Sequence, residues 1–214
     1  MHNALRAIEP SGDLRRELEL LQQFGAPASV AIAFVLTISL APAKARRFLD
    51  WLLAACLTSL TVLVLKVLIA RPRPSLADPF NFRTAMRPYP LDPAAPDKQV
   101  CSWQLAADNI ERLWSMPSSH TAAAVVFAVF LTTVFPRLRV FAIAMAALVA
   151  ACRIMFNAHW PSDTLIGAAV ATAIATPIIR HHAGIRLVDW FWIRFIDKNA
   201  TPKWPATALR NPHS

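Results

Sequence analysis

The chain has 214 residues, of which 56% are hydrophobic and only 16% are charged, so its composition excludes a disordered protein and a coiled coil. There are 22 Lys and Arg residues against 13 Asp and Glu residues, which gives a net charge of +9. This basic balance indicates either nucleic acid or an anionic membrane surface as a partner. Because uncharged apolar runs recur along the chain, we expect an integral membrane protein and no nucleic-acid partner.

Residues 1–25 combine mixed charges with leucines at helical spacing, which predicts an amphipathic segment at the membrane surface. They lack the apolar core of a signal peptide, so none is expected. Helix 13–23 either lies on the membrane or lengthens the first span. Three cysteines without metal-ligand spacing predict neither a disulfide framework nor a metal site.

Five apolar segments follow, each near the length of about 17–25 residues that crosses a bilayer. They comprise residues 26–43, 48–69, 118–135, 140–156 and 164–179. The sequence therefore predicts an all-α, polytopic transmembrane helical bundle of about five to six spans over residues 26–180. A soluble helical core is disfavoured, because so many apolar runs leave too little polar surface to cover them.

Basic residues in the short connections predict the orientation of the bundle. The connections after the first and third spans contain Lys44, Arg46, Arg47, Arg137 and Arg139, and the tail contains Arg180, Arg186, Arg194, Lys198, Lys203 and Arg210. We expect these on the cytoplasmic side, with residues 181–214 as a basic tail that includes an interfacial helix at 186–196. The loop 70–117 then faces outward, irregular at 71–96 and with a short surface helix at 102–113.

Polar residues gather at the outward ends of the spans, where such residues are functional candidates. They are Lys66, Arg73, Ser118, Ser119, His120, Arg153, His159 and Asp163. Alone, Lys66 would be a snorkelling lysine, Ser118 a helix cap and Asp163 a first-turn acid. Their convergence on one side favours a shared site.

The chemistry of this set points to phosphate. Lys66, Arg73 and Arg153 suit an anion with several oxygens, and a helix that starts near residue 118 presents free backbone N–H groups to it. His159 and Asp163 are four residues apart, so the carboxylate can reach the imidazole and orient it for attack on phosphorus. His120 then protonates the leaving oxygen.

The spacings resemble the three motifs of the type 2 phosphatidic acid phosphatase (PAP2) superfamily, which read K-x6-R-P, P-S-G-H and S-R-x5-H-x3-D. The matching positions are Lys66, Arg73 and Pro74, then Pro117, Ser118 and His120, then Arg153, His159 and Asp163. The resemblance covers residues 66–179. It implies a membrane lipid phosphatase with a phosphohistidine intermediate and no metal ion or other cofactor.

By position, the resemblance implies that His159 is the nucleophile, that Asp163 orients it, and that His120 is the general acid and later the base. Lys66, Arg73, Ser118, Ser119 and Arg153 would bind the phosphoryl oxygens. Ser119 replaces the family's glycine and Cys152 replaces its serine, so backbone approach at the first position and a hydrogen bond at the second are altered. Five spans is one fewer than the usual six.

We therefore expect an enzyme of the bacterial inner membrane with its active site facing the periplasm. Undecaprenyl diphosphate is the favoured substrate, with phosphatidate, phosphatidylglycerophosphate and lipid A phosphates as alternatives. Two other functions stay open: a phosphotransferase that uses the same histidine, and a non-catalytic membrane lipid-binding protein. Neither the choice of lipid nor the oligomeric state follows from the sequence.

Overall fold

The structure is a computed structural model that describes residues 12–76, 82, 84–91 and 96–201. Its helices are α2 (Gly12–Leu21), α3 (Pro27–Leu40), η1 (Pro42–Arg47), α4 (Phe48–Ile69), η2 (Ile110–Leu113), α5 (Ser119–Val134), η3 (Pro136–Leu138), α6 (Arg139–Met155), α7 (Pro161–Arg180) and α8 (Ala183–Phe195). Two short strands, β1 (Tyr89–Pro90) and β2 (Gln99–Val100), complete the described elements. The all-α bundle predicted from the sequence is thus confirmed.

All five predicted spans are helices, although their lengths differ. Three helical stretches among the described residues, Pro42–Ile69, Pro136–Met155 and Pro161–Arg180, are long and apolar enough to cross a membrane. The other two, α3 and α5, are apolar but shorter. The first span is a helix only over Pro27–Leu40, because Pro27 opens it and the chain turns at Gly25, where φ is +88°.

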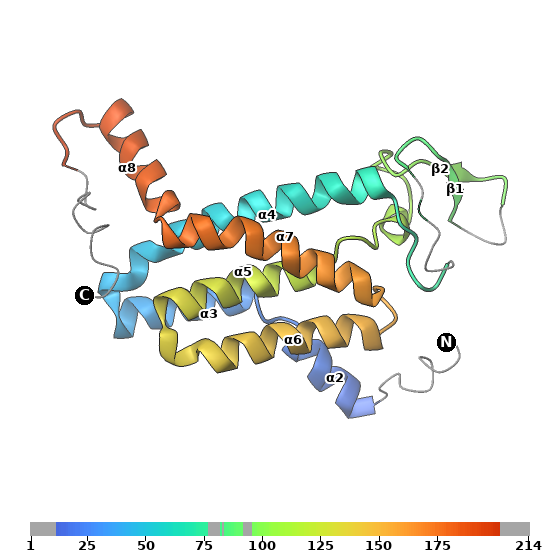
Figure 1. Cartoon of the computed structure of the whole chain (residues 1–214), viewed down its shortest axis with the longest axis horizontal. Coiled ribbons are helices and arrows are strands. Elements are labelled where there is room, and N and C mark those ends of the chain that lie inside the picture. Colours follow the sequence, from blue (N-terminus) through green and yellow to red (C-terminus); the bar gives the residue numbers. More distant parts are fainter. Residues whose placement is uncertain (1–11, 77–81, 83, 92–95, 202–214) are drawn as a thin grey trace.

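Helix α5 is the centre of the bundle and packs against α4, α6 and α7 (Figure 1). Its buried side chains combine three alanines, which let neighbouring helices approach, with larger residues such as Val126, Phe127 and Phe130, which fill the core. Phe130 is fully buried, and its ring lies 4.6 Å from the ring of Phe48 on α4. This packing fixes the axial register between α4 and α5.

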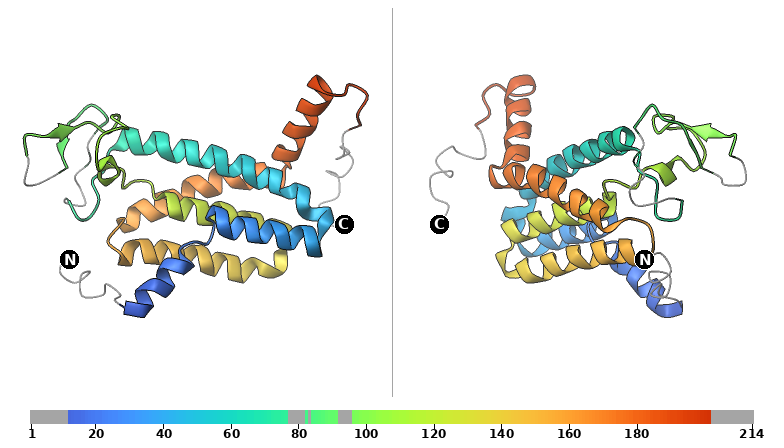
Figure 2. Two further views of the ribbon diagram at one scale, coloured as in Figure 1. Left: turned by 180° about the vertical axis from the view of Figure 1, so that it is seen from behind. Right: turned by 45° about the vertical axis from the view of Figure 1, so that its right-hand side comes forward.

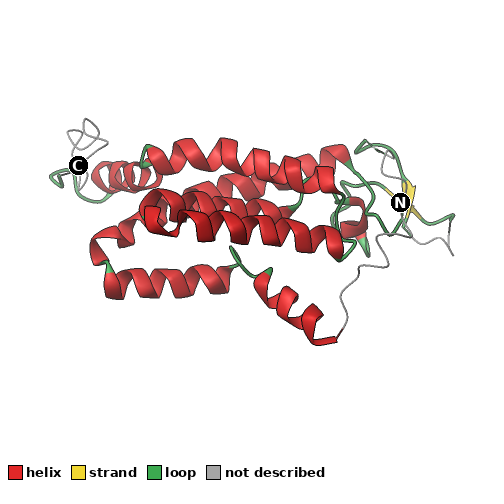
Figure 3. Cartoon of the chain, turned by 60° about the horizontal axis from the view of Figure 1, so that its bottom comes forward, coloured by secondary structure: helices red, strands yellow, loops and turns green. Residues whose placement is uncertain are grey.

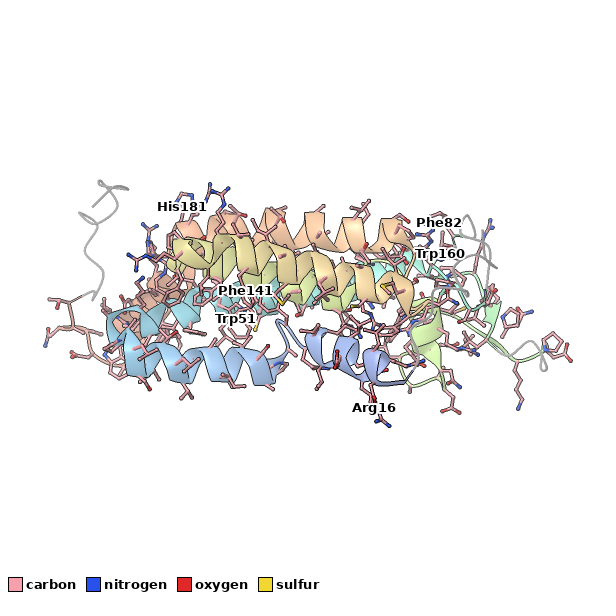
Figure 4. The ribbon with its side chains drawn as sticks, turned by 90° about the horizontal axis from the view of Figure 1, so that it is seen from below. Arg16, Trp51, Phe82, Phe141, Trp160 and His181 are labelled. Carbon is pink, nitrogen blue, oxygen red and sulfur yellow. The ribbon has the colours of Figure 1, made fainter. Side chains whose placement is uncertain are left out.

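The bundle has two chemically different ends. At the site end, α4 and α6 finish while α5 and α7 begin; at the basic end lie η1, η3 and the start of α8 (Figure 2). Figure 4 shows Trp160 and Phe82 together at the site end and His181 near the other. The cations of η1 and η3 therefore share one end, as predicted; Lys203 and Arg210 of the tail lie outside the described residues.

Helix α2 leaves the bundle at an angle instead of extending α3 (Figure 3). Its polar face is exposed, and it contacts the bundle through α6. The turn that follows it is anchored by Gln22, whose side chain is only 6% exposed. Residues 12–21 thus form the amphipathic helix that was predicted, while residues 1–11 lie outside the described part of the chain.

Helix α8 is attached to the start of α4. The Asp50 carboxylate accepts a hydrogen bond from the backbone N–H of Ile185 at 3.0 Å. A Cβ at Gly184 would lie 2.1 Å from the Leu49 carbonyl oxygen, so only glycine permits this approach. Aromatic side chains of α8 such as Trp190 are exposed, which fits the predicted interfacial helix.

The loop between α4 and α5 differs from the prediction. Strands β1 and β2 pair antiparallel, with Tyr89 opposite Val100, where irregular chain was expected. The predicted helix at 102–113 is helical only over Ile110–Leu113, because Asn109 adopts a left-handed conformation with φ of +59°. The Ser102 hydroxyl donates to the Val67 carbonyl oxygen at 2.5 Å and ties this segment to the end of α4.

The three cysteines are free and lie in different surroundings. Cys56 is exposed on α4, Cys101 is half-buried in the loop at the site end, and Cys152 is buried in α6.

Candidate active site

The end of α4 supplies the first cation of the site. Lys66 is 8% exposed, and its Nζ donates to the Trp114 carbonyl oxygen at 3.0 Å. Ala70 ends the helix in a left-handed conformation, which turns the chain toward Arg71 and Arg73. The backbone N–H of Arg73 donates to the Arg112 carbonyl oxygen at 2.8 Å. The loop thereby places its arginines beside the end of the helix.

The start of α5 contributes its N-terminus to the site. Ser118 caps the helix: its fully buried Oγ accepts from the backbone N–H and the hydroxyl of Thr121 at 3.4 and 3.1 Å. Ser119 and His120 follow in the first turn and are exposed. A Cβ at Gly167 would lie 2.7 Å from the Ser118 carbonyl oxygen, so glycine permits α7 to pack against this turn. The site-facing positions are therefore 119 and 120, while the Ser118 hydroxyl faces inward.

His159 lies between α6 and α7 with 3% of its surface exposed. Its Nδ1 lies 2.6 Å from the Ser115 carbonyl oxygen. Because a carbonyl oxygen only accepts hydrogen bonds, this contact assigns the proton to Nδ1 and leaves the lone pair on Nε2. Among the described residues, no hydrogen bond to Nε2 is present. An imidazole held in this way has the tautomer of a nucleophile.

Asp163 is fully buried and has three hydrogen-bonding neighbours. Its Oδ1 accepts from Arg71 Nη1 at 2.5 Å, and its Oδ2 accepts from the Ser115 hydroxyl at 2.5 Å and from the Trp160 backbone N–H at 2.9 Å. The last contact makes Asp163 part of the capping box of α7. The carboxylate is thus held rigidly in one place.

The predicted Asp–His contact differs from expectation in one respect. Asp163 Oδ2 lies 3.8 Å from His159 Nδ1, which is too long for a direct hydrogen bond. Ser115 connects the two, because its hydroxyl binds the carboxylate while its carbonyl oxygen accepts from the imidazole. Asp163 therefore acts on His159 mainly through its charge and through the position of Ser115.

Two guanidinium groups in the site have unsatisfied donors. The Nε atoms of Arg73 and Arg153 are buried and have no hydrogen-bond partner among the described residues. Arg153 Nη1 donates to the Gln22 side-chain oxygen at 3.0 Å. Buried donors without partners are costly unless a ligand supplies acceptors, and a phosphate oxygen is an acceptor of the right kind.

The cations act electrostatically on His159. Burial lowers the pKa of His159 below its usual value, and the charges of Arg153, Lys66 and Arg73 lower it further, while Asp163 opposes this shift. Burial likewise lowers the pKa of Arg73. His159 is therefore kept neutral, and the three predicted cations lie close enough to influence it.

Three residues of the site were not predicted from the sequence. They are Arg71, which binds Asp163; Ser115, which bridges Asp163 and His159; and Gln22, which binds Arg153. Arg71 had one signal, since it forms a second Arg-Pro pair directly after the second span. Ser115 and Gln22 had none, because their roles depend on distant segments that meet only in the fold.

The site can hold an oxyanion. Arg73 and Arg153 present Nε donors without partners in the described part of the chain, Lys66 adds a third positive charge, and α5 offers its N-terminal backbone groups. Within the described ranges, no group of three His, Cys, Asp or Glu side chains gathers as metal ligands would. The arrangement places the neutral imidazole of His159 beside the positive charges of Lys66, Arg73 and Arg153.

Comparison with known proteins identifies relatives of this fold. The model of the PAP2 superfamily matches residues 47–186. No curated protein matches the sequence. The solved structure of LpxE from Aquifex aeolicus is similar with a TM-score of 0.56 and 18% sequence identity, over 83% of this chain and 93% of that one. At this identity the likeness concerns the fold alone.

Proposed function

This chain belongs to the PAP2 superfamily and is a membrane phosphatase, and we propose that it releases phosphate from a membrane lipid phosphate or diphosphate through a phosphohistidine intermediate. The observation that carries the proposal is the state of His159. Its Nδ1 is fixed by the Ser115 carbonyl oxygen, and its Nε2 lone pair is unused beside three cations. No other described histidine combines these features.

In the first step, His159 Nε2 attacks the phosphorus atom. A P–N bond forms, the P–O bond to the lipid breaks, and His120 gives a proton to the leaving oxygen. The positive charge that develops on the imidazole is stabilised by the Asp163 carboxylate 3.8 Å away. The products of this step are the dephosphorylated lipid and phosphohistidine.

In the second step, water replaces the imidazole. His120, now neutral, takes a proton from the water as its oxygen attacks phosphorus, the P–N bond breaks, and inorganic phosphate leaves. Lys66, Arg73, Arg153 and the first turn of α5 with Ser119 stabilise the charge on the phosphoryl oxygens in both steps. Ser118 acts through the cap that holds this turn in place.

The membrane orientation is proposed from charge. The cations of η1 and η3 lie at the end opposite the site, so the basic end faces the cytoplasm and the site faces the periplasm of a bacterial inner membrane. We propose residues 26–180 as the phosphatase domain, with residues 1–25 and 181–214 as segments at the two membrane surfaces. Undecaprenyl diphosphate is the favoured substrate because its released form is exposed on that side.

A phosphotransferase is the second candidate function. Ser119 and His120 are exposed, so a lipid hydroxyl has the same access to a phosphohistidine as water has. Phosphate release by the purified protein without an acceptor lipid distinguishes hydrolysis from transfer.

The test is a panel of lipid phosphates assayed for phosphate release by purified protein in detergent. The panel contains undecaprenyl diphosphate, phosphatidate, phosphatidylglycerophosphate and a lipid A phosphate. His159→Ala removes activity toward every substrate, whereas His181→Ala, an exposed histidine at the basic end, retains it. Acid-labile, base-stable label on the protein that disappears in His159→Ala supports the covalent step; full activity of His159→Ala contradicts the proposal.

A further inference from the structure

A groove runs inward from the active site between α4 and α5. Its volume is about 280 Å³, and Lys66, Trp114 and Ser119 line the end nearest the site. Deeper in, the lining is mostly small and apolar, with Ala55, Val62, Ala122, Ala123 and Val126, and the hydroxyl residues Thr58 and Ser59 also belong to it. The groove therefore connects two proposed phosphate-binding residues to an apolar channel at membrane depth.

The groove exists because α3 covers only part of the α4–α5 face. Figures 1 and 2 show α3 beside the basic-end half of the bundle, and α2 turning away from it. The turn rests on α5 at Gly25, where a Cβ would lie 2.8 Å from the Ala123 carbonyl oxygen. Beyond this point Ser59 and Leu63 of α4 stay exposed, so the groove opens sideways into the surrounding membrane.

Trp51 lies at the inner end of the groove. It lines this groove and also a second one between α3 and α4, and of the α4 residues in the first groove it is the farthest along the helix from Lys66. Figure 4 places Trp51 between the two ends of the bundle. Trp51 and Lys66 are fifteen positions apart on α4, which corresponds to about 22 Å along the helix. The groove therefore extends about 22 Å from Lys66 to Trp51.

We propose that this groove holds one hydrocarbon chain of the substrate and that Trp51 sets the length of chain that fits, an inference that rests on the proposed phosphatase function. The phosphate lies at Lys66 and Ser119, and the chain enters from the open side and runs inward past Val62 and Ala122. Trp51 and Ala123 are then specificity-determining residues, far from the reacting atoms.

A series of single-chain alkyl phosphates that differ by two methylenes tests the proposal. Below their aggregation limits, each methylene that moves from water into the groove lowers KM by about two- to fourfold, and the decrease stops when the chain reaches Trp51. Trp51→Ala moves this plateau to longer chains. A plateau at the same length in the wild type and in Trp51→Ala overturns the role of Trp51.

A second variant fills the groove without altering its inner end. Ala123→Phe raises KM for long-chain phosphates by at least about fivefold and leaves kcat/KM for a chainless aryl phosphate within about twofold. The control is Ala147→Phe, the same change in a separate groove between α5, α6 and α7, which leaves the chain-length profile unchanged. Equal effects of both variants contradict the proposal.

Thr58 tests the chemical nature of the occupant. Its hydroxyl is buried and has no hydrogen-bond partner among the residues that the structure describes, whereas the hydroxyls of Thr37 and Thr61 donate to carbonyl oxygens four residues earlier. With a hydrocarbon chain in the groove, Thr58→Val keeps the shape and leaves KM unchanged or lower. A rise of KM by more than about threefold indicates a polar occupant and overturns the inference.

The experiments distinguish an error in the groove inference from an error in the proposed phosphatase function. If no lipid or alkyl phosphate releases phosphate, the proposed function is wrong. If phosphate is released, and Trp51→Ala and Ala123→Phe both keep the wild-type dependence on chain length, the function stands and the groove inference is wrong.

Discussion

The bundle contains two buried clusters of an aspartate, an arginine and a histidine, one at each end. They comprise Asp163, Arg71 and His159 at the site end and Asp50, Arg47 and His182 at the basic end. The aspartate Oδ2 lies 3.8 Å from the histidine Nδ1 in the first cluster and 3.7 Å in the second. Each aspartate is fully buried and binds a backbone N–H at the start of a helix.

The clusters differ in the hydrogen-bond partner of the histidine Nε2 atom. His182 Nε2 lies 2.9 Å from Arg47 Nη1, and because a guanidinium only donates, the lone pair of His182 is occupied. The Nε2 of His159 has no such partner in the described part of the chain, and Arg73 and Arg153 nearby have unused donors. The second ring nitrogen therefore distinguishes the two clusters: Arg47 binds that of His182, whereas that of His159 is left available beside Arg73 and Arg153 among the described residues.

The sharpest test of this comparison exchanges the two histidines for alanine. His159→Ala lowers kcat for phosphate release by at least about 10⁴-fold, because the nucleophile is lost. His182→Ala leaves kcat within about threefold and lowers stability by about 1 kcal/mol through the lost contact with Arg47. Phosphate release and thermal unfolding in detergent measure these effects. Comparable losses of kcat in both variants would remove the distinction.

Replacing the aspartates by asparagine gives the next largest difference. Asp163→Asn lowers kcat by roughly 10²- to 10⁴-fold, because the developing imidazolium loses its counter-charge and Ser115 loses its anchor. Asp50→Asn lowers the free energy of unfolding by about 1–3 kcal/mol, because the start of α8 and Arg47 lose a charged partner, and leaves kcat of the folded protein unchanged. If Asp50→Asn reduced kcat as Asp163→Asn does, the basic end would have a catalytic role.

The third prediction concerns Gln22, whose side chain accepts a hydrogen bond from Arg153. Gln22→Ala removes the partner of Arg153 Nη1 and raises KM about three- to tenfold with a smaller change in kcat, since phosphate binding depends on the position of that guanidinium. The adjacent Gln23 has an exposed side chain, so Gln23→Ala is the matched control with unchanged KM. The hypothesis fails if both variants give the same KM as the wild type.

The smallest expected effect is on pH dependence. His159 attacks only when neutral, so kcat/KM falls as the pH drops through its pKa. Since burial and the nearby cations lower this pKa, the acid limb of the wild type lies below the usual value of about 6.5. Arg153→Gln removes one positive charge and moves the limb upward by less than about one unit. A pH profile of kcat/KM measures it, and a downward shift would contradict the assignment.

Much of the fold followed from hydrophobic patterning. The five apolar segments became α3 to α7, since long uncharged runs leave few alternatives to a helix in a membrane. The loop 70–117 was predicted less well. Its β1–β2 pair and the short helix η2 depend on turns such as the one at Asn109, and on hydrogen bonds to α4 that no local pattern reveals.

For the site, the sequence identified the charged groups but not the connections between them. His159 and Asp163 were expected to bond directly because they are four residues apart, yet the turn before α7 separates them and Ser115 lies between. Arg71 also precedes a proline, but only Arg73 has the family spacing from Lys66, and in the structure Arg71 is the partner of Asp163. Motif spacing thus predicts which residues lie near one another. The hydrogen-bond partners of each residue depend on segments that are distant in the sequence.

The distribution of cysteines provides a natural marker of sidedness. Cys56 faces lipid on α4 and Cys152 is buried, so a bilayer-impermeant maleimide has access to a single thiol, Cys101, at the site end. With the site facing the periplasm, intact spheroplasts are labelled without permeabilisation, and Cys101→Ser provides the blank. Labelling that requires permeabilised cells would place the loop on the cytoplasmic side. Labelling of native Cys101 therefore measures which side of the membrane the site end faces, and the labelled protein itself needs no introduced cysteine.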